Sequence, residues 1–428
     1  MRAFYTIGIF LYGVAARIAA LWSPQAKLLA QGWSHSFDGV SQLREEAFRQ
    51  NKKIAWFHAA SLGEFEQARP VIESFHRLHT EYLVCLTFFS PSGYEVRHNY
   101  DQTDLVTYMP LDTPGKARRW VETLKPSVAF FVKYEFWYNL LGQLQKNHIP
   151  TYLFSAIFRP NQYFFRPVVG RWFRCQLQCY SHIFVQNQDS MQLLTQKARL
   201  AHVSVAGDTR FDRVHDIALQ APARPEIEAF VGDSPVLLAG SSWEPDEENI
   251  HHFLQRYQGA LKIILAPHII GENHLKAIEQ LFGPHTLRYT CLKRLAKEGN
   301  ERALRQAASY RTLVIDNMGM LSSLYRYATV AYIGGGFGKG IHNILEAITF
   351  GKPVIFGPNH TKFKEAMDII ACGGGKSYRT DDELTAYLTA WLTDSDIYQQ
   401  AATQSAQYAH ANLGATTIIL TTVQPRLL

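Results

Sequence analysis

The chain has 428 residues, of which 47% are hydrophobic, and a formal net charge of +6 at pH 7. This length is enough for two domains with sizeable cores. The mild positive charge fits an anionic substrate or a membrane surface but is too weak to indicate nucleic-acid binding. The cysteines lack a zinc-site spacing, and their odd, scattered set indicates free thiols in a reducing compartment. They are Cys85, Cys175, Cys179, Cys291 and Cys372.

The N-terminal segment Phe4–Trp22 is almost entirely apolar and contains one charged residue, Arg17. As a helix it would come close to the thickness of a bilayer core. A signal peptide would not be expected to carry Arg17 inside its apolar region. A helix buried against the protein surface is a second alternative. We favour a membrane anchor or a helix lying in the membrane interface, within residues 1–30.

Strand-like and helix-like segments alternate along the rest of the chain, which predicts an α/β protein with parallel sheets. The predicted strands cover 53–60, 82–90, 127–137, 150–157, 182–187, 235–243, 261–268, 312–317, 329–336 and 352–358. Residues 216–234 have weak periodicity and read as a linker. We therefore expect two doubly wound, Rossmann-like domains facing a cleft, with residues 31–215 in the first and 216–428, including closing C-terminal helices, in the second.

The glycine-rich stretch from Gly334 to Pro358 raises the question of a phosphate ligand. It is not a P-loop, because Lys339 is followed by glycine instead of a hydroxyl residue, and it does not match the dinucleotide fingerprint. Its strand, turn, helix and strand instead predict a βαβ unit whose helix N-terminus faces an anion. His342, Asn343 and Glu346 at the helix start favour a ligand over a plain tight turn, and Glu346 would suit a ribose diol.

Glu64 follows the first predicted strand at the start of a helix, where its carboxylate would face the cleft and act as a general base. The alternative is a helix cap, because Ser61 and Glu64 have the spacing of a capping box. On this motif alone the cap is the simpler interpretation.

Other polar residues also follow predicted strands, where doubly wound folds place their sites. They are Ser90, Ser92, Lys133, Glu135, Asp208, Arg210, Pro267, His268, Asn317, Met318 and Gly319. The segment Phe158–Arg174, with Arg159 and Arg166, has four arginines and no acidic residue. It would meet phosphates and acyl chains at a membrane or pair its arginines elsewhere. Asp394 and Asp396 read as a turn and cap, not as a metal site, and no metal is predicted.

These motifs together resemble the 3-deoxy-D-manno-octulosonic acid (Kdo) transferases of lipopolysaccharide synthesis. The likeness covers nearly the whole chain and is most specific in residues 316–366. It extends to "HAASLGEFEQARP", "YMPLDTPGKARRW", "EFWYNL" and "VAGDTRFD", in order and spacing. The resemblance implies a GT-B glycosyltransferase with CMP-Kdo as donor and a lipid A precursor as acceptor. It also implies a location on the cytoplasmic face of the inner membrane and no cofactor.

The resemblance carries roles onto matching residues. Glu64 matches the general base, which reverses the preference for a cap, and Glu135 and Arg210 are the other catalytic candidates. Arg210 stands where the family usually has lysine, His268 where arginine is common, and Lys133 where the first of two glutamates is usual. The implied CMP-binding residues are Pro267, His268, Asn317, Met318, Gly319, Asn343, Ile344, Leu345 and Glu346. Weaker candidates for acceptor or Kdo contact are Ser61, Gly63, Ser90, Ser92, Lys133, Arg159 and Arg166.

The expected reaction is a single displacement that inverts the anomeric carbon of Kdo, with an oxocarbenium-like transition state. Two alternatives share the architecture. A two-domain sugar-nucleotide epimerase would not need the apolar N-terminal segment. A membrane-anchored nucleotide-binding protein without catalysis would not need Glu64 within its full motif.

Overall fold

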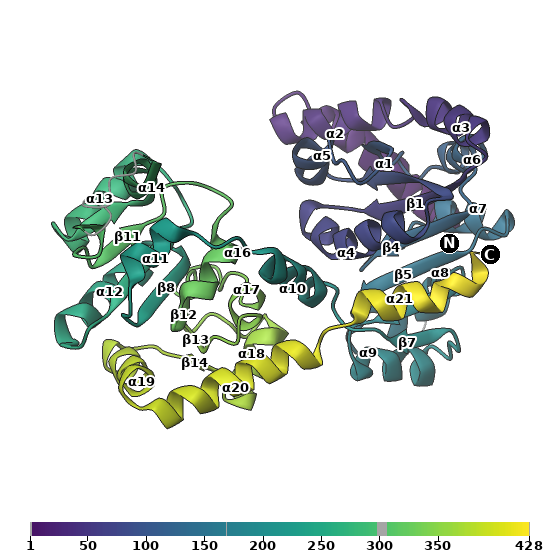
Figure 1. Cartoon of the computed structure of the whole chain (residues 1–428). Coiled ribbons are helices and arrows are strands. Elements are labelled where there is room, and N and C mark those ends of the chain that lie inside the picture. The colour runs from purple at the N-terminus through teal and green to yellow at the C-terminus, as the bar shows by residue number, and fades with distance from the viewer. Residues whose placement is uncertain (1, 168, 298–305, 428) are drawn as a thin grey trace. The chain divides into compact units, whose positions relative to one another are not determined.

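The computed structural model describes residues 2–167, 169–297 and 306–427, and the chain divides into two α/β units (Figure 1). The first unit contains Met1–Arg213 and Leu413–Leu428, and the second contains Val214–Asn412. Each unit is built around its own seven-stranded parallel sheet. The two parallel sheets expected from the alternating pattern are therefore present.

The sheet of the first unit has the strand order β3-β2-β1-β4-β5-β6-β7. Its strands are β1 Lys53–Ala59, β2 Tyr82–Phe88, β3 Leu105–Tyr108, β4 Val128–Val132, β5 Thr151–Ala156, β6 His182–Val185 and β7 Val203–Val205. The central strands are almost wholly buried because helices cover both faces, which explains why they read as continuous apolar runs. The order reverses between β1 and β4, and a crevice at this point is where doubly wound sheets bind ligands.

Helices of the first unit alternate with these strands. They are α1 Arg2–Ala19, α2 Pro24–Ser34, α3 Val40–Arg49, α4 Leu62–Leu78, α5 Pro91–Arg97, α6 Pro114–Leu124, α7 Tyr138–Lys146, α8 Gly170–Leu177, α9 Gln188–Gln192 and α21 Ala415–Val423, with short turns of other helix types at Tyr163–Phe165, Leu193–Lys197 and Gln424–Arg426. The helix α10, Arg210–Gln220, begins in this unit and continues into the second.

The sheet of the second unit has the order β10-β11-β9-β8-β12-β13-β14. Its strands are β8 Val236–Ser242, β9 Lys262–Pro267, β10 Thr286–Arg288, β11 Thr312–Val314, β12 Val330–Ile333, β13 Val354–Phe356 and β14 Gly375–Ser377. Its helices are α11 Pro225–Val231, α12 Glu244–Arg256, α13 Glu272–Phe282, α14 Tyr289–Lys297, α16 Leu321–Leu324, α17 Leu345–Ile348, α18 Lys364–Cys372, α19 Asp381–Thr393 and α20 Ser395–Ala411, with a 3-10 turn at Tyr325–Tyr327. Here the order reverses between β8 and β12.

The C-terminal segment differs from the sequence prediction, which placed it in the second domain. Residues Leu413–Leu428 belong to the first unit, where Ile419 and Val423 are buried in its core. Asp212 accepts hydrogen bonds of 2.7 Å from the backbone N–H groups of Gly414 and Thr416 and so caps α21. These contacts join residues far apart in sequence, so composition alone could not reveal them.

The predicted linker 216–234 is also more regular than expected, because α10 and α11 occupy most of it. In contrast, Asp394 accepts hydrogen bonds from the N–H groups of Asp396 and Ile397 at the start of α20. The prediction of turn and cap chemistry at this Asp-x-Asp pair is confirmed.

The N-terminal segment forms α1, and a hydrogen bond joins this helix to the rest of the first unit. The Tyr5 hydroxyl donates to Asp112 Oδ2 at 2.7 Å, and the ring of Tyr5 packs against Tyr138 and Trp172. A methyl group on Gly13 would lie 2.5 Å from the Leu111 side chain, so α1 approaches the unit closely there. Within the described residues, no helix combines the length and apolar character that a membrane crossing requires.

Candidate functional site

The predicted catalytic residues of the first unit gather at the carboxyl ends of its parallel strands. Ser61, Gly63 and Glu64 follow β1, and Lys133 and Glu135 follow β4, so these two groups flank the point where the strand order reverses. This is the crevice position at which doubly wound sheets bind ligands. The two groups arise on separate segments of sequence and are brought together by the pairing of β1 with β4.

Glu64 lies in the first turn of α4, and its side chain is half-buried. The Ser61 hydroxyl donates to Glu64 Oε2 at 2.5 Å. Ser61 makes no side-chain hydrogen bond to the helix N-terminus, so the capping box that its spacing allowed does not form. Glu64 is therefore an acceptor carboxylate held by a neighbouring hydroxyl.

Glu135 is 4% exposed and is held by buried partners. Its Oε2 lies 3.1 Å from His58 Nε2 and also accepts from Trp137 Nε1. The other ring nitrogen of His58 contacts the Thr87 hydroxyl at 2.8 Å. Because this network occupies Oε2, a contact between Glu135 and a substrate would have to use its other oxygen.

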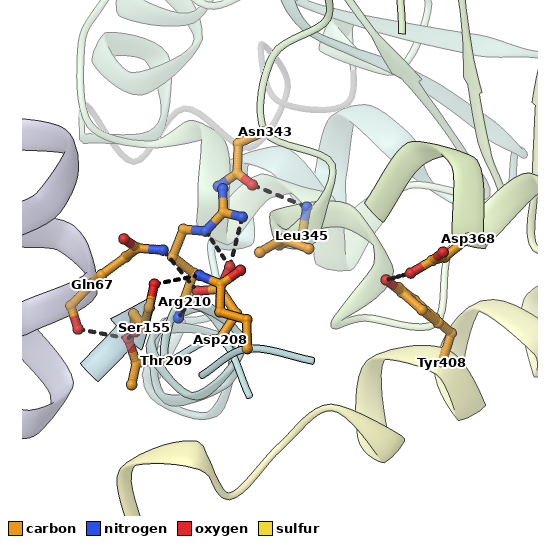
Figure 2. Close-up of polar contacts among 10 residues, drawn as sticks. Gln67, Ser155, Asp208, Thr209, Arg210, Asn343, Leu345, Asp368 and Tyr408 are labelled. Carbon is orange, nitrogen blue, oxygen red and sulfur yellow. Dashed lines mark hydrogen bonds and ion pairs between the residues drawn. The ribbon is translucent and has the colours of Figure 1, made fainter. Parts of the chain in front are cut away.

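Arg210 begins α10 and is oriented by a carboxylate (Figure 2). Asp208 Oδ2 accepts from both Nε and an Nη of Arg210, at 2.9 and 2.7 Å. Gln67, one turn after Glu64 on α4, donates to Asp208 Oδ1 at 3.1 Å, and its backbone carbonyl accepts from the Thr209 hydroxyl at 2.6 Å. One buried residue on the Glu64 helix therefore fixes the turn that carries Arg210.

Tyr134 lies between two predicted site residues. Burial raises the pKa of its phenol, the Arg159 charge lowers it and the Glu64 charge raises it. Arg166 is exposed in the segment that follows β5. Lys133 adopts a left-handed backbone with φ of 64°, a strained conformation for a residue with a side chain.

The serines after β2 have a structural role in this fold. Ser90 is the N-cap of α5, and its hydroxyl accepts from the N–H of Ser92 at 3.2 Å. The two hydroxyls lie 3.0 Å apart. They line the same sheet edge as Glu64, one strand away.

The second unit has a cavity of ≈ 570 Å³ at the point where its own strand order reverses. Its lining comes from the ends of β8, β9 and β12 and consists of Trp243, Pro245, Asp246, His268, Gly335, Phe337, Gly338, Lys339, Gly340 and His342. The volume and the mixture of aromatic rings, backbone amides and a lysine suit a nucleotide-sized ligand.

Three rings form one wall of this cavity. The ring of His268 stacks on that of Trp243, with centroids 4.7 Å apart, and on that of His342, with centroids 4.4 Å apart. Trp243 Nε1 donates to His342 Nε2 at 3.1 Å. Burial and the neighbouring His268 lower the pKa of His342. His342 is therefore held as a neutral acceptor.

The remaining predicted donor residues lie around the same sheet edge but do not line the cavity. Pro267 is buried at the end of β9, and Met318 is 79% exposed in the turn after β11. Gly319 has φ of 87°, which favours glycine at this turn. Asn317 Nδ2 contacts Met320 Sδ, while its buried Oδ1 has no hydrogen-bond partner among the described residues.

The segment after the glycine-rich turn differs from the helix that the sequence predicted. The helix α17 has only four residues, and Asn343 Oδ1 accepts from the Leu345 N–H at 3.1 Å, as Figure 2 shows. Asn343 Nδ2 also donates to Glu346. The side chains of Ile344 and Leu345 are buried, so they offer a ligand only their backbone. The predicted helix is therefore only one turn long, and the anion site expected at its N-terminus stays a prediction.

Several residues of these sites were not identified from the sequence. His58 and Gln67 sit within apolar or helical patterns and gave no polar signal of their own. Trp243 and Asp246 follow β8, and a closer reading of every strand end would have found them. Tyr134 stands between two residues that were identified.

The geometry agrees with comparisons to known proteins. A family model described as 3-Deoxy-D-manno-octulosonic-acid transferase (kdotransferase) matches residues 31–213, which contain the Glu64, Glu135 and Arg210 segments. A curated 3-deoxy-D-manno-octulosonic acid transferase from Aquifex aeolicus is 24% identical over 355 residues, which cover 82% of this chain and 89% of that protein. Residues 31–213 thus match the Kdo transferase family, and curated Kdo transferases are similar over most of the chain.

These similarities identify the chain as a glycosyltransferase. A bifunctional glycosyltransferase/methyltransferase from Fusobacterium nucleatum is also similar, at 24% identity over 72% of this chain, but the chain spans only 48% of that protein. Among solved structures, a UDP-GlcNAc 2-epimerase from Neisseria meningitidis has a TM-score of 0.60 at 17% identity, covering 87% of this chain and all of that one. At this identity the likeness concerns the fold.

Proposed function

We propose that this Kdo transferase moves Kdo from CMP-Kdo to a lipid A precursor, lipid IVA, in lipopolysaccharide biosynthesis, with inversion at the anomeric carbon. The observation that carries the proposal is the position of Glu64. It is a half-buried carboxylate at the reversal point of the first sheet, inside the segment that matches the kdotransferase family.

In this proposal Glu64 takes the proton from an acceptor hydroxyl while that oxygen attacks the anomeric carbon of Kdo. The bond from the anomeric carbon to the CMP phosphate breaks, and CMP leaves with the bonding electrons. The hydrogen bond from Ser61 orients the Glu64 carboxylate. Arg210, fixed by Asp208, would offset negative charge on the phosphate or on the Kdo carboxylate.

The second unit would bind the donor through the cavity between β8 and β12. Its aromatic wall and glycine-rich turn suit a nucleoside monophosphate, and Lys339 supplies a positive charge at the rim. In the proposal Glu346 and Asn343, which are hydrogen-bonded to each other, would contact the ribose. In the proposal no cofactor takes part, because the donor carries its own leaving group.

We further propose that α1 associates with the cytoplasmic face of the inner membrane. The exposed apolar side chains recur at helical spacing, which gives the helix one apolar face. On α1 they are Phe4, Ile7, Phe10, Leu11, Val14 and Ile18, and the exposed Leu21 and Trp22 follow just after the helix ends. The opposite face, with Tyr5 and Gly13, packs on the first unit. Such a helix would lie in the interface and bring the site to a lipid acceptor.

The test is a transfer assay with freshly generated CMP-Kdo and tetraacyl lipid A precursor, with products identified by mass. A product heavier by one or more Kdo residues supports the proposal. In parallel, the protein is incubated with UDP-GlcNAc alone. Epimerisation of that sugar, with no Kdo transfer, would replace the proposal by the epimerase alternative. Nucleotide binding without either reaction would favour a non-catalytic protein.

A further inference from the structure

In the second unit, the positive charge that would face the donor phosphate depends on the protonation of a histidine. The helix α17 is only four residues long, and the N–H of its first residue, Leu345, already donates to Asn343. Lys339 lines the cavity but is exposed on the glycine-rich turn. The family resemblance expects an arginine, with its permanent charge, where this chain has His268. Histidine is instead the side chain whose charge changes between pH 5 and 8.

The geometry of the stack determines which ring accepts a proton. An indole N–H can only donate, so the 3.1 Å bond from Trp243 requires an unprotonated Nε2 on His342. Two imidazolium rings at the 4.4 Å separation of His268 and His342 would repel each other. A charged His268 would instead lie against the face of Trp243, at a distance where a cation is attracted to an aromatic ring. His268 is therefore the proton acceptor of the pair.

The charged groups near His268 leave this ring able to accept a proton. Asp246 lines the cavity, but its oxygens already accept from Tyr332 at 2.8 Å, Gly335 N at 2.9 Å and Trp243 N at 3.0 Å. Beneath the wall, Glu247 is paired with His274 at 2.9 Å. A phosphate entering the cavity is then the anion free to favour a charged His268.

We propose that the stacked rings of Trp243, His268 and His342 form the phosphate-binding wall of the donor site. In this proposal His268 takes up one proton from solvent when the phosphate of a nucleoside-monophosphate donor binds. The inference rests on the proposed function for the class of ligand. The inference adds that the affinity of this chain for the donor falls as pH rises. With arginine at position 268, the affinity would not depend on pH over this range.

The test is calorimetric binding of the methyl ester of CMP to the full chain between pH 6 and 8.5. This probe carries one phosphodiester charge over that range, as the donor does, so the ligand contributes no proton of its own. Comparison of buffers with different ionisation enthalpies gives the number of protons taken up. Wild type is expected to take up at least about 0.5 proton near pH 7.5, with affinity falling by up to about tenfold per pH unit.

Three variants separate His268 from other titrating groups. His268→Arg should bind at pH 8.5 as tightly as wild type does at pH 6, without uptake, whereas His268→Gln should bind weakly at every pH. His251→Gln, on α12 and hydrogen-bonded to Gln255, should behave as wild type. Equal thermal unfolding of the variants would establish that they are folded.

The outcomes distinguish this inference from the proposed function. Binding by wild type without proton uptake, or uptake that persists in His268→Arg, overturns the inference and leaves the donor assignment standing. Binding of the UMP ester but not the CMP ester, still with uptake lost in His268→Arg, supports the wall and contradicts CMP-Kdo as donor. Binding of neither ester overturns both.

Discussion

The hydrogen bond between Tyr5 and Asp112 should control how firmly α1 is attached to the first unit. Tyr5→Phe keeps the ring that packs on Tyr138 and Trp172 and removes only the hydroxyl. A hydrogen bond to a charged, buried group contributes about 1.5–3 kcal/mol. Since 1.36 kcal/mol corresponds to tenfold, the population of molecules with α1 detached should rise by about 10- to 150-fold.

The free-energy cost of Tyr5→Phe should depend on pH. Burial raises the pKa of Asp112 to about 7, while hydrogen bonds from Tyr5, Asn139 and Leu140 partly oppose the shift. A raised carboxyl pKa stabilises the fold below the unfolded value of about 3.9, and this stability is lost as pH rises through 7. Above pH 7 the Tyr5 bond is to a carboxylate, and below it to a neutral acid. The cost of Tyr5→Phe should therefore be about 1 kcal/mol at pH 5.5 and larger at pH 8.

Hydrogen exchange of the α1 amides measures this detachment directly, since amides that exchange by opening report its free energy. The ratio of variant to wild-type exchange at one pH removes the intrinsic pH dependence of exchange. Tyr12→Phe is the control, because Tyr12 lies on the same helix with its ring against Trp33 and Phe89. A ratio below threefold at pH 8, or the same ratio at both pH values, would refute this reasoning.

Two further substitutions, one in each unit, test the hydrogen bond of Gln67 and the close backbone approach at Gly334. Gln67→Met removes the donor to Asp208 while keeping the shape of the side chain. In steady-state transfer, kcat should fall by about 10- to 100-fold with little change in donor KM. An unchanged kcat would show that the turn carrying Arg210 is held without the Gln67 hydrogen bond. Gly334→Ala would place a methyl group 2.1 Å from the Ser241 carbonyl oxygen. It should destabilise the second unit by about 2 kcal/mol or more in thermal unfolding. In the control Gly338→Ala, the nearest atom would lie 3.6 Å from the new methyl group, so the loss of stability should be far smaller. Equal losses in the two alanine variants would argue against this close approach.

The sequence predicted most of the sheet architecture because buried parallel strands have continuous apolar runs. The strand Lys53–Ala59 and the position of Glu64 after it follow directly from that pattern. The wrong assignments depended on contacts that no local pattern contains. The C-terminal helix joins the first unit through Asp212, and α17 ends after one turn although the apolar spacing continues to Phe350.

The polar networks of the site were even less accessible to sequence reasoning. His58 and Glu135 are 77 residues apart and meet because β1 pairs with β4. Trp243, His268 and His342 likewise lie at the ends of three different strands, and their stacking depends on the registers of those strands. Residue type and position after a strand identified candidates, while their partners required the folded sheet.

The measurement that tests the account most directly is single-turnover transfer by Glu64→Gln beside wild type, with saturating CMP-Kdo and tetraacyl lipid A precursor. Glu66→Gln is the matched control, because Glu66 lies on the same helix and pairs with Arg97 at 3.1 Å. If Glu64 is the general base, its replacement should slow the chemical step by about 10²- to 10⁴-fold with donor binding unchanged, and the control should transfer at close to the wild-type rate. A Glu64→Gln rate within tenfold of wild type would contradict the central claim and require another base.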